Sequence, residues 1–228
     1  MKSILVLIAT ASCAVFAGPM KPEQAHHRRE VTKPWGGAVQ EGQGWNFVTG
    51  TLTVPEIKDQ DPERAVAIWV GIDGYSCQSG AIWQTGLTWY GDGRMENWYE
   101  WYPEPPSAYP EPFSASPGDK VKMTVHADSP TSGNSTLENL STGQSVSTQH
   151  SNMQQQLCLQ DAEWVLEDFE QKELADFGSF TFTDTAANGE SGPGNPEGAI
   201  IVEVEADGQE KTSCRSDANS VTCQYTGN

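Results

Sequence analysis

Short runs in which apolar and polar residues alternate, or in which Val, Ile and Thr dominate, recur along most of the chain. A period of two is typical of β-strands with one buried face. Turn formers such as Gly91-Asp92-Gly93 and Ser116-Pro117-Gly118-Asp119 separate these runs, and no long stripe has the 3.6-residue period of a helix. We expect strands at Trp45–Val54, Ala65–Ile72, Ala81–Tyr90, Trp98–Tyr102, Lys120–Ala127, Ser132–Asn139, Gln144–His150, Ala162–Phe169, Gly178–Thr183, Ile200–Glu205 and Val221–Tyr225.

Many short, evenly spaced antiparallel strands predict an all-β sandwich or barrel. The chain has no internal repeat and no linker long enough to divide it. The residues that follow the N-terminal segment, about 200 of them, suit one domain with a substantial core. We therefore expect a single β-sandwich domain over residues 30–228.

The first 17 residues have the pattern of a secretory signal peptide. Lys2 supplies the charged start, Ile4–Ala9 the apolar core, and Val15-Phe16-Ala17 a small-x-small cleavage site. A membrane anchor is the alternative, but the apolar run is too short to span a bilayer, and no later segment is long and apolar enough. We expect a secreted, extracellular protein.

Residues 18–29 form a short basic stretch that ends in His26-His27-Arg28-Arg29. This composition suggests a propeptide with a dibasic processing site, and a plain N-terminal tail is the alternative. We expect its basic residues to lie against acidic groups of the main domain until acid neutralises those groups.

The cysteines indicate disulfides. Cys13 leaves with the signal peptide, so an even number, four, remains in an oxidising compartment. Three pairings are possible; we expect Cys77–Cys158, which closes a long loop, and Cys214–Cys223, which closes a short terminal hairpin. A zinc site is the alternative, but the chain lacks the CxxC spacing typical of one.

Two sequons, at Asn134 and Asn139, fit surface glycosylation of a secreted chain. Either sequon can equally be a simple turn. We expect a glycan on at least one of them.

The charge balance is strongly acidic, with 13 basic and 31 acidic residues and a net charge of −18. Residues 1–29 hold four of the basic residues and one acidic residue, so their removal leaves a net charge of −21. This excess argues against nucleic acid or an anionic membrane as a partner. Because protonation relieves the self-repulsion, we expect acidic surroundings, although acidity can also serve solubility alone.

Two strings place a polar residue inside an apolar, strand-like run: Gln84 within Ala81–Gly86, and Glu167 within Ala162–Glu170. Such a group is costly to bury without a partner or a task. The chain has no GxSxG, no HExxH and no Asp-Thr-Gly or Asp-Ser-Gly, and we expect His126 and His150 to be packed or surface residues. Carboxyl and amide groups must then carry any chemistry, without a metal or cofactor.

Strand alternation places Glu163 and Glu167 on one face of their strand, and Glu96, Trp98 and Glu100 on one face of another. Carboxyls beside aromatic residues predict a cleft with aromatic walls and an acidic floor. Crowding of like charges and burial would raise the pKa of some of these carboxyls. Any one of them can equally be part of a solvated strand face.

Five strings in order resemble the eqolisins, the glutamic peptidases of fungi. They are Trp35-Gly36-Gly37-Ala38, Ala67–Gly74, Ala81–Gly86, Trp98–Pro103 and Ala162–Glu170. The match runs from about Trp35 to the C-terminus. The resemblance implies a lectin-like, concanavalin-type sandwich of two large antiparallel sheets. It also implies an acid endopeptidase that acts on protein and peptide substrates, and we expect a monomer.

The resemblance further implies that Gln84 and Glu167 form the catalytic pair. Glu167 would be the general base and acid that activates water, and the Gln84 amide would stabilise the oxyanion. Positions that line the cleft of the family are matched by Trp35, Trp69, Asp73, Glu96 and Glu100. The chain departs from the pattern at Pro34, where we expect asparagine, and at Trp83, where we expect leucine.

Two other functions fit the same composition. One is a secreted carbohydrate-active sandwich, a glycosidase or a lectin with an aromatic groove, since such proteins also place carboxylates on one sheet. The other is a binding module without activity. Gln84 discriminates against a glycosidase, which would need a second acid at that position.

Overall fold

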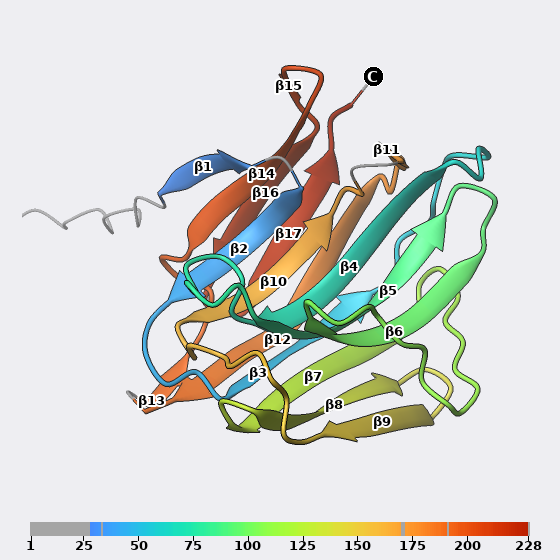
Figure 1. The fold of residues 1–228 in the computed structure, drawn as a ribbon. Coiled ribbons are helices and arrows are strands. Elements are labelled where there is room, and N and C mark those ends of the chain that lie inside the picture. The colour runs from blue at the N-terminus through green and yellow to red at the C-terminus, as the bar shows by residue number, and fades with distance from the viewer. Residues whose placement is uncertain (1–27, 33, 170–171, 191, 228) are drawn as a thin grey trace, which may run out of the picture.

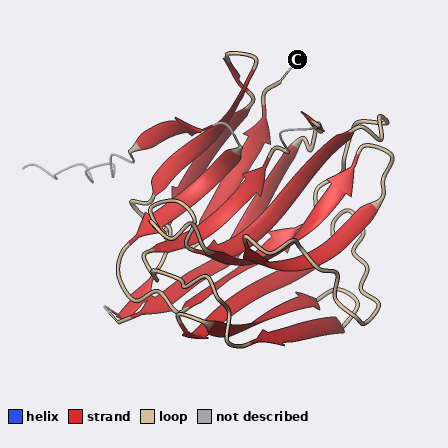
Figure 2. Cartoon of the chain, in the orientation of Figure 1, coloured by secondary structure: helices blue, strands red, loops and turns tan. Residues whose placement is uncertain are grey.

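The computed structural model describes residues 28–32, 34–169, 172–190 and 192–227 (Figure 1). Every regular element of these residues is a strand (Figure 2). Two large sheets pack face to face as a sandwich, which confirms the predicted fold class. The predicted signal peptide and most of the predicted propeptide lie outside the described residues. The described part holds no helix that could cross a membrane.

Sheet 1 has nine strands in the described part of the chain, in the order β1-β14-β2-β10-β4-β5-β6, with β11 beside β4 and β15 beside β14. The pairs are antiparallel, except that β1–β14 and β11–β4 are parallel. The bounds are β1 (Arg29–Thr32), β14 (Ile200–Ala206), β2 (Trp35–Glu41), β10 (Asp161–Glu167), β4 (Arg64–Ile72), β5 (Ile82–Tyr90), β6 (Met95–Tyr102), β11 (Glu173–Leu174) and β15 (Gln209–Glu210).

Sheet 2 has eight strands among the described residues, in the order β16-β17-β12-β3-β7-β8-β9, with β13 beside β12. It lies behind and below sheet 1 in Figure 1. The bounds are β16 (Thr212–Asp217), β17 (Ser220–Tyr225), β12 (Ser179–Gly189), β3 (Phe47–Thr53), β7 (Lys120–Ser129), β8 (Ser132–Asn139), β9 (Gln144–His150) and β13 (Gly192–Gly194).

The main core fills the space between the sheets. Trp164 of β10 is fully buried there, and its indole N–H donates to the carbonyl of Thr49 at 2.8 Å. A second apolar cluster, which includes Trp69 and Val165, covers the opposite, outer face of sheet 1. Because both faces are apolar, β4 and the first six residues of β10 are buried almost continuously instead of alternating.

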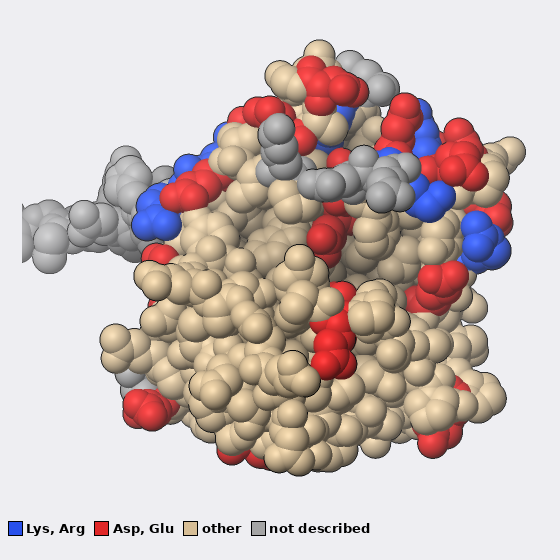
Figure 3. Space-filling model, in the orientation of Figure 1, with Lys and Arg blue, Asp and Glu red and all other residues tan. Residues whose placement is uncertain are grey.

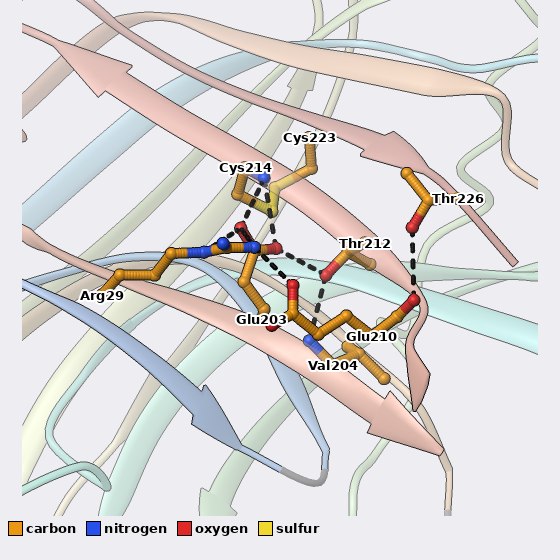
Figure 4. A network of polar contacts seen from close by, with 8 residues as sticks. All are labelled: Arg29, Glu203, Val204, Glu210, Thr212, Cys214, Cys223 and Thr226. Carbon is orange, nitrogen blue, oxygen red and sulfur yellow. Dashed lines mark hydrogen bonds and ion pairs between the residues drawn. A yellow bond between two sulfur atoms is a disulfide. The ribbon is translucent and has the colours of Figure 1, made fainter. Parts of the chain in front are cut away.

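The N-terminal strand β1 is tied into sheet 1 by a polar network (Figure 4). The Arg29 guanidinium contacts Glu203 at 3.3 Å and Glu210 at 2.5 Å. Glu203 is 1% exposed, and it also accepts hydrogen bonds from the Thr212 hydroxyl and the Cys214 backbone N–H. Arg29, the last residue of the predicted propeptide, is thus part of a folded strand, and the boundary at residue 29 stays a prediction.

Both predicted disulfides are present. Cys77–Cys158 links the loop after β4 to the segment before β10, across 81 residues. Cys214–Cys223 joins β16 to β17 at directly opposite positions. A crosslink across a long loop removes more freedom from the unfolded chain than one across a short loop.

The two sequons lie on β8, but their asparagines differ in access. Asn134 is partly exposed, whereas Asn139 is 1% exposed. The Asn139 side-chain nitrogen, to which a glycan would be attached, donates to the carbonyl of Ser114 and to Asp119. Asn134 is therefore the more accessible of the two asparagines in the folded structure, and a glycan on either sequon stays a prediction.

Candidate active site

The site is built on the outer face of sheet 1. Strands β10, β4, β5 and β6 are neighbours and antiparallel, and residues directly opposite each other place their side chains on the same face. One such row runs Glu167, Ala67, Thr88, Glu96, and another runs Glu163, Gly71, Gln84, Glu100. The predicted pair, Gln84 and Glu167, therefore shares one face, two strands apart.

Glu167 is the last residue of β10, and its carboxyl is partly buried between two indoles. The Trp69 Nε1 donates to Glu167 Oε2 at 3.1 Å, and the ring centres of Trp35 and Trp69 lie 5.1 Å apart, edge to face. Burial raises the pKa of Glu167 to about 7; the two indole N–H groups oppose this shift, and the charge of Glu100 adds to it.

Gln84 is 3% exposed. Its Nε2 donates to Glu100 Oε2 at 2.5 Å, and its Oε1 is buried without a hydrogen-bond partner. Burial raises the pKa of Glu100, and the hydrogen bond from Gln84 opposes this shift. Glu100 thus contacts Gln84 directly and acts on Glu167 through its charge.

Two glycines, Gly71 and Gly86, leave space for the Trp69 side chain between Gln84 and Glu167. A Cβ on Gly86 would lie 2.6 Å from both the carbonyl oxygen of Ile68 and the Cβ of Trp69. A Cβ on Gly71 would lie 2.7 Å from the ring of Trp69. Any larger residue would displace the Trp69 side chain that holds Glu167.

Figure 3 shows acidic side chains in a hollow at the centre of the face that sheet 1 presents, surrounded by uncharged residues. The basic side chains on this view lie at the periphery. We call this hollowed outer face the cleft face and define it by Trp35, Trp69, Gln84, Glu100 and Glu167. Acidic groups in a low-dielectric hollow favour protonation, as the raised pKa values of Glu100 and Glu167 indicate.

The other predicted cleft residues divide into two groups. Glu96 lies at the end of the Glu167 row, is exposed, and accepts a hydrogen bond from the Tyr90 hydroxyl at 3.0 Å. Asp73 is fully buried with a positive φ of 67°, and its carboxyl accepts the backbone N–H groups of residues 158 to 161. The Asp73 carboxylate therefore fixes the loop before β10, and its oxygens are occupied.

Tyr75 is a residue that the sequence did not indicate. It packs against the apolar cluster of the cleft face, and its hydroxyl donates to Glu30 of β1. The contact links the turn after β4 to the N-terminal strand. The only signal in the sequence was its place directly after the string Ala67–Gly74.

A pocket of about 870 Å³ adjoins the end of β10. Its lining includes Asp168, Phe169 and Pro34, which follow or precede site residues, but neither Gln84 nor Glu167. Phe169 also packs against the cleft-face cluster, so the pocket extends the cleft face beyond Glu167. We assign the chemistry to the cleft face because the amide and the indole-bound carboxyl are there.

One group of side chains among the described residues could in principle hold a metal ion. Asp73, Cys77 and Cys158 bring possible ligand atoms close together. The two sulfurs form a disulfide, and the Asp73 carboxylate is occupied by backbone N–H groups. This trio therefore has a structural role.

Residues 33–225 match the model of the Peptidase A4 family. The chain is 39% identical to aspergillopepsin-2 of Aspergillus niger over 226 residues, and 40% identical to scytalidopepsin B of Scytalidium lignicola over 207 residues. Each match covers 86% of this chain and 78% of the relative.

Solved structures of glutamic peptidases also resemble this chain in fold. A scytalido-glutamic peptidase with a peptide-based transition state analog superposes with a TM-score of 0.80 at 38% identity, covering 85% of this chain and 98% of that one. The aspergilloglutamic peptidase from Aspergillus niger gives a TM-score of 0.67 at 40% identity, covering 72% and 99%. The chain therefore belongs to the peptidase A4 family of glutamic peptidases and is a hydrolase of peptide bonds.

Proposed function

We propose that the protein is a secreted acid endopeptidase in which Glu167 and Gln84 act together on one peptide bond. The observation that carries the proposal is their common place on the cleft face, with Glu100 in contact with Gln84 and acting electrostatically on Glu167. Relatives solved with a peptide-based transition state analog and with a tripeptide support a peptide as substrate. The signal-like residues 1–17 support secretion.

Glu167 moves the protons. In its ionised form it takes a proton from a water molecule, whose oxygen then attacks the carbonyl carbon of the substrate. The protonated Glu167 returns that proton to the leaving nitrogen as the C–N bond breaks, which yields a carboxylic acid and an amine. The indole N–H of Trp69 stabilises the ionised form and orients the carboxyl.

Gln84 stabilises the oxyanion. An amide has two N–H donors, and Glu100 occupies one, so the second is available to the negative oxygen of the tetrahedral intermediate. Gln84 Oε1 has no partner within the protein and is an acceptor for the attacking water. A fixed oxyanion donor contributes about 3–4 kcal/mol to transition-state stabilisation in other hydrolases.

The pKa of Glu167 decides how much of the carboxyl is in the active, ionised form at a given pH. At a pKa of about 7, only a small fraction of the carboxyl is ionised in acid. The same shift makes that fraction a stronger base, which offsets part of the loss. The working form is therefore the one in which Glu167 has lost its proton.

The test is a pair of substitutions with matched controls. We expect Glu167→Gln and Gln84→Ala each to lower kcat/KM for an unfolded protein substrate at acidic pH by about 100-fold or more. Glu138→Gln and Gln149→Ala, on β8 and β9 of sheet 2, should stay within about twofold of the parent. Full activity in a folded Glu167→Gln or Gln84→Ala variant would reject the pair. A β-glucan assayed alongside tests the carbohydrate-active alternative.

A further inference from the structure

Glu163 is a buried carboxyl that the proposed reaction does not use. Its side chain is 0% exposed, and neither carboxyl oxygen has a hydrogen-bond partner. A buried polar group without partners is costly, and a buried charge without partners is far more costly. Among the described residues, the buried carboxyls of Glu203 and Asp73 are satisfied instead, because their oxygens accept hydrogen bonds.

Glu163 is a neighbour of the working groups on the outer face of sheet 1. It is on the same strand face as Glu167, and its row crosses Gly71 to reach Gln84. Its Oε2 is 3.1 Å from the point where a Cβ on Gly71 would sit, and the Trp69 ring lies 2.7 Å from that same point. The carboxyl and the indole therefore meet over Gly71, and this indole is the one that donates to Glu167.

The charges that act on Glu163 are acidic. From its own strand β10 they are Asp161 and Glu167, and from the turn after β4 the charge is that of Asp73. Neighbours in its row carry no charge at Val39, Gly71 and Gln84, and the row ends at Glu100. Burial raises the pKa of Glu163 well above its usual range, these charges raise it further, and the backbone N–H of Tyr75 opposes the shift without a well-formed hydrogen bond.

We propose that Glu163 is a positioning residue that must stay neutral: as an uncharged carboxyl it supports Trp69 and the floor between Gln84 and Glu167, and its ionisation disrupts the site. The inference rests on the proposed function of the Gln84–Glu167 pair. The active form then has Glu167 ionised and Glu163 protonated. A site of this kind works over a window of pH, because a falling pH removes the first condition and a rising pH removes the second.

The physical reason is the lack of any partner for a charge at Glu163. An ionised carboxyl there would face Asp73, Asp161 and Glu167 from inside the sheet, and the cheapest relief is the entry of water. Water that enters over Gly71, between the carboxyl and the indole, would displace the Trp69 ring and with it the N–H donor of Glu167. Glu163 thus acts through Trp69 and touches no substrate.

The experiment is Glu163→Gln in the full chain, which keeps the size of the side chain and stays neutral at every pH. The readout is the pH profile of kcat/KM on a peptide substrate, together with urea unfolding at each pH. We expect kcat/KM in acid to stay within fivefold of the parent. We expect the alkaline limb of this profile to move up by one pH unit or more, so that the variant is at least tenfold more active than the parent on that limb.

Glu203→Gln is the matched control. Glu203 is as buried as Glu163 and lies in the same sheet, but its oxygens accept hydrogen bonds. Its substitution should therefore leave the alkaline limb of the pH profile unchanged. Asp161→Asn tests the same idea in the opposite direction. Removal of the Asp161 charge makes Glu163 easier to ionise, so the alkaline limb should move to lower pH. This variant also decides the case if Glu163→Gln does not fold.

Two results would overturn the inference. One is an alkaline limb that neither Glu163→Gln nor Asp161→Asn moves. The other is a folded Glu163→Gln protein that has lost more than 100-fold in acid, which would make Glu163 a proton carrier instead of a neutral support. Failure of the proposed function has a different signature, because a folded Glu167→Gln or Gln84→Ala variant would then keep full activity.

Discussion

The indole Nε1 of Trp69 lies 3.1 Å from Glu167 Oε2, while the ring of the same residue covers Gly71. Trp69 therefore joins the proposed base to the floor of the cleft face. A donor to a carboxylate favours the ionised form, which is the form that takes a proton from water. The working state of Glu167 thus depends on a residue of the neighbouring strand.

Trp69→Phe should weaken the base while it keeps most of the ring. Loss of the N–H donor raises the pKa of Glu167, so a smaller fraction is ionised in acid. A hydrogen bond to a charged group is worth about 1.5–3 kcal/mol, which predicts a loss in kcat/KM of about 10- to 100-fold in acid. The acid limb of the pH profile should move to higher pH, and an unmoved limb would show that the bond does not set the pKa.

Glu100→Gln should act in the opposite direction on the same limb. The charge of Glu100 raises the pKa of Glu167, so its removal lowers that pKa and moves the acid limb to lower pH. A glutamine oxygen at position 100 can still accept from Gln84, so the oxyanion donor stays oriented. The pH profile of kcat/KM measures the shift, and Glu96→Gln at the exposed end of the Glu167 row provides the comparison.

The sequence predicted the strand faces but not which strands are neighbours. Alternation placed Glu163 and Glu167 on one face, and the structure agrees. In the structure, Gln84 lies opposite Gly71, and Gly71 lies opposite Glu163. This arrangement depends on the registers of three strands, which alternation does not predict. Asp73 matched a cleft position, yet a left-handed backbone turns its carboxyl inward to bind the loop before β10.

One central strand, β2, was missed from the pattern of residues. Gly36 and Gly37 give it low β-propensity, and few β-branched residues offset them. The reason for glycine is tertiary, because a Cβ on Gly37 would lie 2.3 Å from the carbonyl oxygen of Trp164. The close approach of β2 to β10 therefore requires glycine, and the same glycines kept the strand from being predicted from the sequence.

Stability should fall as the pH rises, because Glu167 binds its proton more tightly in the folded than in the unfolded chain. Its folded pKa is about 7 against an ordinary value of 4.5, so the folded state holds more protons between these values. The free energy of unfolding then decreases from pH 4.5 to pH 7, by up to about 3 kcal/mol from this group. Urea unfolding at pH 4 and pH 7.5 should show the loss, and Glu167→Gln should reduce it by this amount.

The pair Arg29–Glu203 makes a prediction about processing. Glu203 is buried, and its cation partner is the last residue of the predicted propeptide. Cleavage after Arg29 would leave Glu203 with its hydrogen bonds to Thr212 and Cys214 but without the guanidinium. Because Arg29 is half exposed, the cost should be modest, about 1–2 kcal/mol in the free energy of unfolding at neutral pH.

Arg29→Ala should reproduce that loss. The surface variant Arg94→Ala, which removes an exposed ion pair with Asp92 and a contact with the Tyr90 ring, should cost less. The loss should also shrink in acid, where Glu203 takes up a proton; its pKa is raised by burial, while Cys214, Thr212 and Arg29 oppose the shift. Mass spectrometry of the purified protein fixes the natural N-terminus. A mature chain that begins at Glu30 and equals the Arg29-containing chain in stability would show that this contact contributes nothing to the fold.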